Sequence, residues 1–111
     1  MSELDKLEKY LKENGYKYTR EDRDFINHGY WTELDIHQIN VFDRKGNFIF
    51  DAICHSGSYG YREGLLEIRG DIVMEEDGDS VVGMLTAEDV IKRIKKYKAL
   101  FFDNGERKTD E

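Results

Sequence analysis

The sequence predicts an α+β fold in which an N-terminal helix and a C-terminal helix pack on one antiparallel sheet of about four strands. Two amphipathic segments with helix-capping residues lie at residues 2–14 and 86–100, and segments rich in β-forming residues lie between them. At 111 residues, the chain has the usual length of one domain. We expect this domain to span residues 1–102 and residues 103–111 to form a polar, disordered tail.

The first helix is expected at residues 2–14, where leucines recur at helical spacing. Ser2 followed by Asp5 is close to a capping box, in which each side chain bonds the other residue's backbone amide. Gly15 gives the helix a C-terminal stop. The apolar stripe of this helix is formed by Leu4, Leu7 and Leu11, with Tyr10 beside them.

The segment after this helix is the least regular part of the sequence. Residues 16–19 alternate in character and predict a short strand. Residues 20–33 mix charged residues with Gly29 and several aromatic residues. We expect residues 20–33 to form a loop that contains a short helix or a turn.

The central part of the sequence carries a strong β-hairpin signal. Residues 35–42 and 48–54 are rich in β-forming residues, and a turn that contains glycine separates them. Side chains alternate along a strand, so Phe50 lies on one face of the second strand and Ile53 on the other. Both faces are partly apolar, and we therefore expect this strand to be central in the sheet.

Two further strands are predicted before the second helix. The first covers residues 65–74 and is interrupted at Gly70. An acidic turn at residues 76–79 then leads into the last strand at residues 80–85.

The last helix is expected to begin after Thr86, which can cap it together with Asp89. Acidic residues near its start and lysines near its end suit the helix dipole. The buried stripe of this helix is expected to consist of Val90, Ile91, Ile94, Tyr97 and Leu100.

The net charge of −7 is concentrated in one segment. Between Glu63 and Asp89, nine acidic residues stand against one basic residue. An acidic surface repels the phosphates of nucleic acid, so we predict no direct nucleic-acid partner. Such a surface can occupy a basic groove on another protein, or it can simply keep the protein soluble. The predicted partner-binding residues, called the acidic band below, are Glu63, Glu67, Asp71, Glu75, Glu76, Asp77 and Asp79.

Residues 55–64 form a glycine-rich loop that is the alternative candidate site. Glycines allow close backbone approach, tyrosines offer stacking faces, and an arginine can bind a phosphate group. The spacing matches neither a dinucleotide-binding motif nor a P-loop, and an ordered structural connection explains the same residues. The ligand-binding candidates in this loop are Ser56, Ser58, Tyr59, Tyr61 and Arg62.

The single cysteine and the three histidines indicate neither a catalytic pair nor a metal site. Cys54 and His55 are neighbours on a strand and therefore point to opposite faces. The histidines at positions 28, 37 and 55 lack helical ligand spacing. We therefore predict no catalytic residues, no metal and no cofactor, and a protein that is not an enzyme.

Cysteine content and the N-terminal residues predict a cytoplasmic protein with no membrane partner. A single cysteine forms no intrachain disulfide, which suits a reducing compartment. The first residues are charged and lack the apolar core of a signal peptide. No apolar run in the sequence is long enough to span a membrane.

Four segments carry a resemblance to a known group of proteins: residues 51–55, 57–61, 64–67 and 85–91. In these segments the sequence resembles small, uncharacterised proteins encoded by phages and mobile elements of Firmicutes. The resemblance covers roughly residues 1–98. It implies an accessory factor, a class that includes inhibitors of host defence, and it supplies no site residue.

Small size, the acidic band and this resemblance together favour a non-enzymatic phage or mobile-element accessory protein. Such a protein would inhibit a host defence system by stoichiometric binding, like an anti-CRISPR protein, and its partner would be a host defence protein or nuclease complex. One alternative is a small-molecule binder that sequesters a nucleotide immune signal through the glycine-rich loop. A structural or interaction domain, and a homo-oligomer, are the remaining alternatives.

Overall fold

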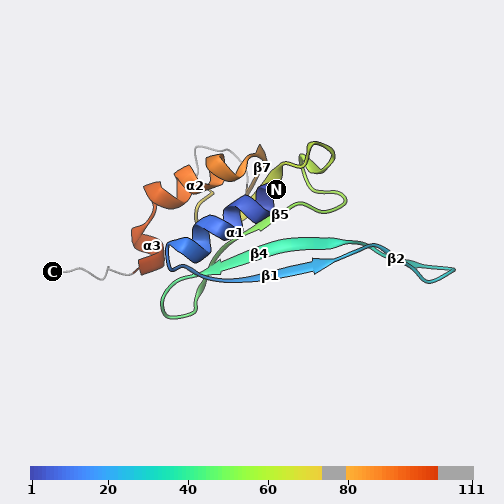
Figure 1. The fold of residues 1–111 in the computed structure, drawn as a ribbon, viewed down its shortest axis with the longest axis horizontal. Coiled ribbons are helices and arrows are strands. Elements are labelled where there is room, and N and C mark those ends of the chain that lie inside the picture. Colours follow the sequence, from blue (N-terminus) through green and yellow to red (C-terminus); the bar gives the residue numbers. More distant parts are fainter. Residues whose placement is uncertain (74–79, 103–111) are drawn as a thin grey trace.

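A computed structural model of the chain describes residues 1–73 and 80–102 (Figure 1). The N-terminal part contains α1 (Glu3–Glu13), β1 (Lys17–Arg23), β2 (Ile26–Asn27), β3 (Thr32–Glu33) and β4 (Ile36–Phe42). The C-terminal part contains β5 (Phe48–Ile53), the short 3-10 helix η1 (Tyr61–Glu63), β6 (Leu66–Gly70), β7 (Val81–Leu85), α2 (Ala87–Lys96) and α3 (Ala99–Phe102). The expected acidic turn at residues 76–79 and the expected tail at residues 103–111 lie outside the described residues.

The α+β fold class is confirmed, but the sheet has five strands rather than about four. The strand order is β1-β4-β5-β6-β7, and every neighbouring pair is antiparallel. The additional strand is β1, because the short strand expected at residues 16–19 extends to Arg23 and pairs with β4 along its whole length. As expected, β5 is central in the sheet.

The prediction of a loop with a short helix or turn at residues 20–33 is wrong for most of that segment. β1 occupies its first part, and β2 pairs antiparallel with β3 in a separate two-stranded ladder. Only the tip is a turn, in which Gly29 adopts a positive φ of 100°. The charged residues of β1 hid this strand from the sequence pattern, because an edge strand with little burial shows no clear apolar alternation.

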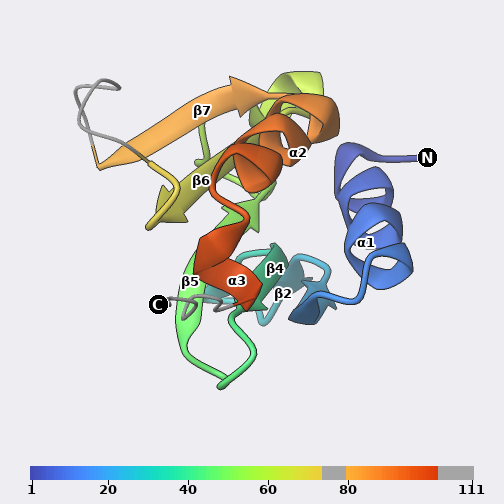
Figure 2. The same cartoon turned by 90° about the vertical axis from the view of Figure 1, so that its left-hand side faces the viewer.

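Both long helices cover one face of the sheet, and the core lies between these two layers (Figures 1 and 2). The leucine stripe predicted for α1 is buried against β4 and α2. Burial of these apolar side chains contributes roughly 25 cal/mol per Å² of apolar surface and is the main force holding the helices in place. The fully buried core residues on the strands are Ile39, Val41, Phe50, Ala52, Leu66 and Ile68.

The predicted capping boxes are present at both helices. Ser2 Oγ accepts a hydrogen bond from the Asp5 amide at 3.0 Å, and Thr86 Oγ1 accepts one from the Asp89 amide at 3.1 Å. The start of α2 has a further partner, because Glu3 Oε1 accepts a hydrogen bond from the Ala87 amide at 2.6 Å. The first residue of α1 therefore ties the two helices together where both begin.

The C-terminal helix differs from the prediction in its last turn. α2 ends at Lys96, and the chain bends before α3, so Leu100 is 40% exposed whereas Phe101 is buried. Because the bend rotates the following turn, the side chain that faces the core is Phe101 instead of Leu100. Phe101 packs edge-on against Phe50 and Tyr16, with ring centroids 6.0 Å and 5.3 Å apart.

Gly70 ends β6, which was expected to continue to residue 74. Its φ is +128°, and a Cβ atom at this position would lie 2.3 Å from the carbonyl oxygen of Ile49. Only glycine fits such a close backbone approach. The Asp71 amide then donates to the same Ile49 oxygen at 2.7 Å, and the chain turns away from the sheet.

Candidate functional site

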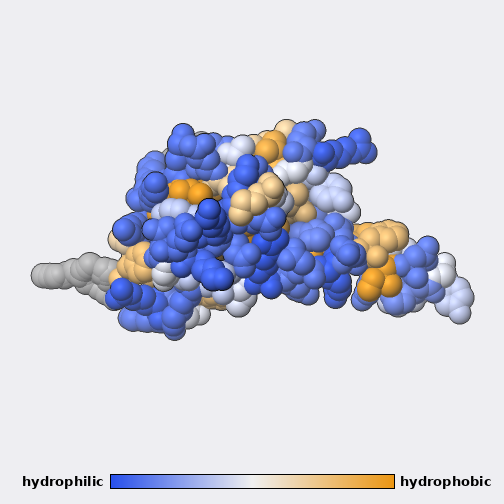
Figure 3. All heavy atoms as spheres, viewed as in Figure 1, coloured by the Kyte–Doolittle hydropathy of each residue, from blue (hydrophilic) through white to orange (hydrophobic). Residues whose placement is uncertain are grey.

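A two-stranded arm, defined as residues 24–35, projects beyond the five-stranded sheet (Figure 1). Its apolar side chains gather on a protruding part of the surface (Figure 3). Tyr30 at the tip is 98% exposed. The other exposed large apolar residues of the arm are Phe25, Ile26, Trp31 and Leu34.

Local contacts hold the arm in one shape although Asp35 at its base is its only buried residue. The ring of His28 stacks on that of Trp31 with centroids 4.0 Å apart, and His28 Nε2 lies 3.4 Å from Glu33 Oε1. At the turn, the His28 amide donates to the Trp31 carbonyl at 2.9 Å, and the Gly29 amide donates to Asn27 Oδ1 at 2.8 Å. The arm therefore presents its aromatic residues in an ordered arrangement.

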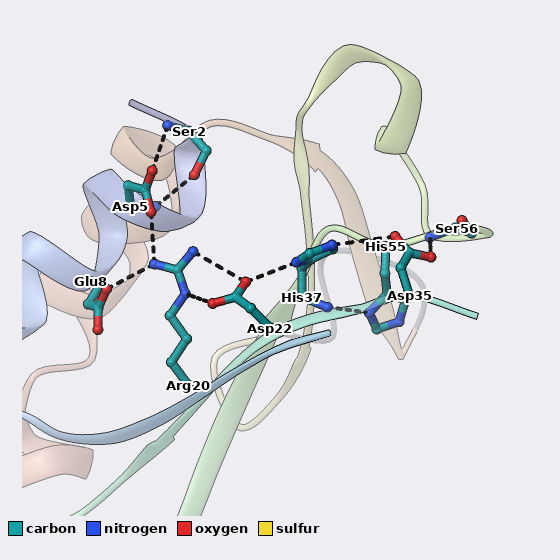
Figure 4. Close-up of polar contacts among 9 residues, drawn as sticks. All are labelled: Ser2, Asp5, Glu8, Arg20, Asp22, Asp35, His37, His55 and Ser56. Carbon is teal, nitrogen blue, oxygen red and sulfur yellow. Dashed lines mark hydrogen bonds and ion pairs between the residues drawn. The ribbon is translucent and has the colours of Figure 1, made fainter. Parts of the chain in front are cut away.

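The base of the arm is fastened to α1 by Arg20 on β1 (Figure 4). Its Nη1 lies 2.9 Å from Asp5 Oδ1 and 2.9 Å from Glu8 Oε1, and its Nε donates to Asp22 Oδ2 at 2.7 Å. The guanidinium is thus shared among three carboxylates from two elements. Most of its N–H groups are engaged in these contacts, so few donors remain to bind a ligand.

The same network continues from Asp22 to the glycine-rich loop (Figure 4). His37 Nδ1 lies 2.9 Å from Asp22 Oδ1, and because a carboxylate only accepts, this contact places a proton on Nδ1. His37 Nε2 lies 3.6 Å from Asp35 Oδ2, and Asp35 Oδ1 accepts a hydrogen bond from the Ser56 amide at 3.1 Å. The network therefore joins α1, both strands at the base of the arm, and the loop.

Hydrogen bonds keep the two carboxylates that flank His37 ionised. Burial opposes ionisation of Asp22, but hydrogen bonds from His37 and Arg20 outweigh it and lower its pKa. Hydrogen bonds from Ser56 lower the pKa of Asp35. Both groups therefore carry negative charge next to the His37 ring.

A groove of about 540 Å³ opens beside this network. Cys54 lines it together with His37, but burial and the charge of Asp35 raise the pKa of the Cys54 thiol. A protonated thiol is a weak nucleophile, and the ring nitrogens of His37 face carboxylates instead. The ring of His55 contacts the backbone of His37, because His55 Nδ1 accepts a hydrogen bond from the His37 amide at 3.4 Å.

Sequence reasoning missed this constellation because it depends on β1. Asp22 lies directly opposite His37 in the β1–β4 register, and this register is unknown while residues 20–33 are expected to form a loop. The signal available in the sequence was the spacing of Arg20 and Asp22, which places both side chains on the same face of a strand. A charged edge strand makes that signal weak.

The glycine-rich loop uses the Ser58 hydroxyl and several of its backbone amides for its own structure. Ser58 Oγ accepts a hydrogen bond from the His55 amide at 3.2 Å, and the Ser56 amide is bonded to Asp35. The Tyr59 amide donates to Glu67 Oε1 at 2.9 Å. The other predicted ligand groups, the side chains of Tyr59, Tyr61 and Arg62, are exposed.

The acidic band is not one continuous surface in the described part of the chain. Glu67 is buried on β6, where it binds the Tyr59 amide. Glu63 lines the groove near α1, and Asp71 is exposed after the end of β6. The remaining members lie outside the described residues: Glu75, Glu76, Asp77 and Asp79.

The described residues contain neither a cluster of metal-binding side chains nor a membrane-spanning helix. Within residues 1–73 and 80–102, no group of three His, Cys, Asp or Glu side chains is arranged to hold a metal ion. In the same part of the chain, no helix combines the length and the apolar character needed to cross a bilayer.

Comparisons with known proteins do not add to this picture. No family model, curated protein or solved structure matches the chain. The resemblance to phage and mobile-element proteins stays an expectation from the sequence. The geometry of the arm, the groove and the loop is the basis for a functional proposal.

Proposed function

We propose that this chain is a non-enzymatic accessory protein that acts by stoichiometric binding to another protein, with the arm as its contact surface. One observation carries the proposal: five large apolar side chains, three of them aromatic, are exposed on a projecting hairpin of twelve residues (24–35). Clustered exposed apolar residues of this kind mark interaction sites, because leaving them in water is unfavourable. Tyrosine and tryptophan are also the residues most often found at the energetic centre of an interface.

The anchoring of the arm supports this role. Arg20 ties the base of the arm to α1 through ion pairs, and His37 connects it to the glycine-rich loop through its contacts with Asp22 and Asp35, at distances of 2.7–3.6 Å in all. The stack of His28 on Trp31 orders the tip. A surface that is ordered before binding loses less conformational entropy when the partner docks.

The charge around the arm indicates what kind of partner it fits. Residues 20–35 contain five acidic and two basic residues. A partner site would therefore combine an apolar pocket with a basic rim, a combination that suits a nucleic-acid-binding protein. We propose a host defence protein or nuclease complex in the cytoplasm as this partner, with the exposed members of the acidic band as additional contacts.

The experiment measures binding of the purified protein to purified host defence nuclease complexes. Trp31→Ala should weaken binding at least about tenfold if Trp31 is an interface centre. Tyr61→Ala is the matched control, because it removes a partly exposed aromatic side chain outside the arm. Both variants should keep the wild-type melting temperature within a few degrees, since neither side chain belongs to the core.

Two results would overturn parts of this proposal. Equal affinity of Trp31→Ala and the wild type would place the interface away from the arm. Retention of none of the nuclease complexes at micromolar concentrations would remove the defence partner.

A further inference from the structure

The end of the molecule opposite the arm carries a second site of different character. Figure 2 looks onto this end, where α3 lies between α2 and the turn that joins β4 to β5. A pocket of about 330 Å³ is found here and is called the basic pocket below. Its lining residues are Tyr10, Asn14, Tyr16, Arg44, Lys98 and Phe102.

Positive charge surrounds the basic pocket although the protein is acidic as a whole. The Arg44 guanidinium carbon lies 5.4 Å and Lys98 Nζ 5.9 Å from the centre of the Phe102 ring. Lys95 Nζ lies 5.9 Å from the centre of the Tyr10 ring. A cation above an aromatic face still has its N–H groups available as donors at the edge of the pocket.

No carboxylate neutralises these cations within residues 1–73 and 80–102. The ion pairs of that part of the chain involve neither Arg44, Lys95 nor Lys98. The acid next to Arg44 in sequence is Asp43, whose carboxylate is occupied by the turn. It accepts hydrogen bonds from the Lys45 amide at 2.9 Å, the Asn47 amide at 2.9 Å and Asn47 Nδ2 at 3.2 Å.

The wall of the basic pocket also contains a hydrogen-bond donor without a partner. Tyr16 is only 7% exposed, and its hydroxyl is buried without a hydrogen-bond partner among the described residues. Burial, and after it the neighbouring Tyr10 hydroxyl, raises the pKa of Tyr16, so the phenol keeps its proton. The Tyr10 hydroxyl is thus close enough to influence the Tyr16 phenol, but the Tyr16 hydroxyl forms no hydrogen bond of good geometry within the described residues. A buried O–H group without an acceptor is unfavourable and would gain from an incoming anionic oxygen.

We propose that the basic pocket binds a small molecule that bears a phosphate group. The planar guanidinium of Arg44 matches two phosphate oxygens, and Lys98 adds a second positive charge. The Tyr16 hydroxyl donates to a further oxygen, and the half-buried Tyr10 ring forms part of the pocket wall. A volume of about 330 Å³ lies at the lower end of ligand pockets and suits a molecule no larger than a mononucleotide.

This site is independent of the arm and of the glycine-rich loop. The basic pocket is built from the end of α1, the start of β1, the β4–β5 turn and α3, whereas the loop connects β5 to β6 near the base of the arm. Its failure would therefore leave the proposed binding function intact. The reverse also holds, because loss of arm binding would not affect a phosphate titration.

The experiment titrates the full chain with inorganic phosphate and with AMP in low-salt chloride buffer, followed by amide NMR. Shift changes are expected at Asn14, Tyr16, Arg44 and Lys98, not in the arm. Tighter binding of AMP than of phosphate would show that an aromatic base stacks in the pocket. Equal affinity would show that the phosphate group alone is bound.

Variants distinguish a specific phosphate site from general attraction of anions to a positively charged surface. Arg44→Ala should weaken phosphate binding about tenfold or more, as for other charge-assisted hydrogen bonds. Tyr16→Phe should weaken it severalfold while leaving the melting temperature of the free protein equal or higher, because it removes an unpaired buried hydroxyl. Lys92→Ala, an exposed lysine on α2 outside the basic pocket, is the charge-matched control and should bind like the wild type.

Three outcomes would overturn the proposal. The first is no shift change with phosphate or AMP at about 10 mM, which corresponds to negligible affinity. The second is an equal loss of affinity in Arg44→Ala and Lys92→Ala, which would indicate unspecific attraction. The third is unchanged affinity in Tyr16→Phe. If Arg44→Ala does not fold, Lys98→Ala tests the same charge from a different element.

Discussion

Tyr59 lies directly against the backbone of Gly83: a Cβ atom at Gly83 would stand 2.2 Å from the Cβ atom of Tyr59. The Tyr59 amide also donates to Glu67 Oε1 on the neighbouring strand at 2.9 Å. These contacts fasten the glycine-rich loop to β6 and β7, although the Tyr59 ring stays 63% exposed. The loop is therefore part of the scaffold as well as a candidate surface.

Gly83→Ala should displace the loop from β7. The added methyl group has no space, and overpacking of this kind costs about 1–3 kcal/mol in free energy of unfolding. Chemical denaturation measures the loss, and amide NMR should show the largest changes in residues 55–64. Val81→Ala, on the same strand, is the control and measures the loss of unfolding free energy caused by a simple truncation in β7. A loss below about 0.5 kcal/mol for Gly83→Ala would mean that the loop does not need this contact.

Ile94→Ala should lower the free energy of unfolding by about 2–5 kcal/mol, because Ile94 is fully buried between α2 and the sheet. Leu100→Ala is the matched comparison in the same C-terminal segment. Leu100 is 40% exposed, so its loss should stay below about 1 kcal/mol. Similar losses in the two variants would show that α3 is oriented differently.

Glu3→Gln should reduce stability at neutral pH and make stability less sensitive to acid. The hydrogen bond from the Ala87 amide is the main cause that lowers the pKa of Glu3 below its ordinary value of 4.5. A carboxyl with a lowered pKa contributes stability above its ordinary pKa and loses it as the pH falls through the lowered value.

The difference in unfolding free energy between wild type and Glu3→Gln should therefore be about 1 kcal/mol or less at neutral pH and vanish in strong acid. Glu13→Gln, at the exposed end of α1, is the control and should behave like the wild type. A constant difference at every pH would mean that the charge of Glu3 plays no part.

Reversal of Glu75, Glu76 and Asp77 to lysine tests the acidic band, although these positions lie outside the described residues. If the band contacts a basic groove, the triple variant should bind a defence nuclease more weakly. The sequence predicts an acidic turn here, and exposed turn charges contribute little to stability, so the melting temperature should change little. Wild-type binding should also weaken with added salt, because exposed charges are screened over about 8 Å at physiological ionic strength. Unchanged affinity in the triple variant would restrict the interface to the arm.

The sequence predicts best those elements whose signals are local. Ser2 with Asp5, and Thr86 with Asp89, form the expected capping boxes, because these contacts span only three residues. The nearly continuous apolar run at residues 48–54 identifies the central strand for a similar reason, since burial on both faces requires apolar residues on both.

The features that escape prediction depend on contacts between distant segments. Asp22 meets His37 only through the β1–β4 register, and the charged residues of β1 conceal that strand. The bend after α2 exchanges Leu100 for Phe101, because Phe101 finds Phe50 and Tyr16 in the core. The basic pocket draws on three separated parts of the chain, so no spacing in the sequence reveals it.

The close approach of Gly70 to Ile49 has a consequence for how the chain folds. The space beside the Ile49 carbonyl oxygen holds glycine, which has no side chain. It has no room for a side chain such as that of Arg69 or Asp71, the two neighbours of Gly70. A β6 strand that slips by one position against β5 would bring one of those side chains into this space, and it would also turn Ile68 away from the helices. Gly70 therefore favours the observed β5–β6 register over registers shifted by one residue while the sheet assembles.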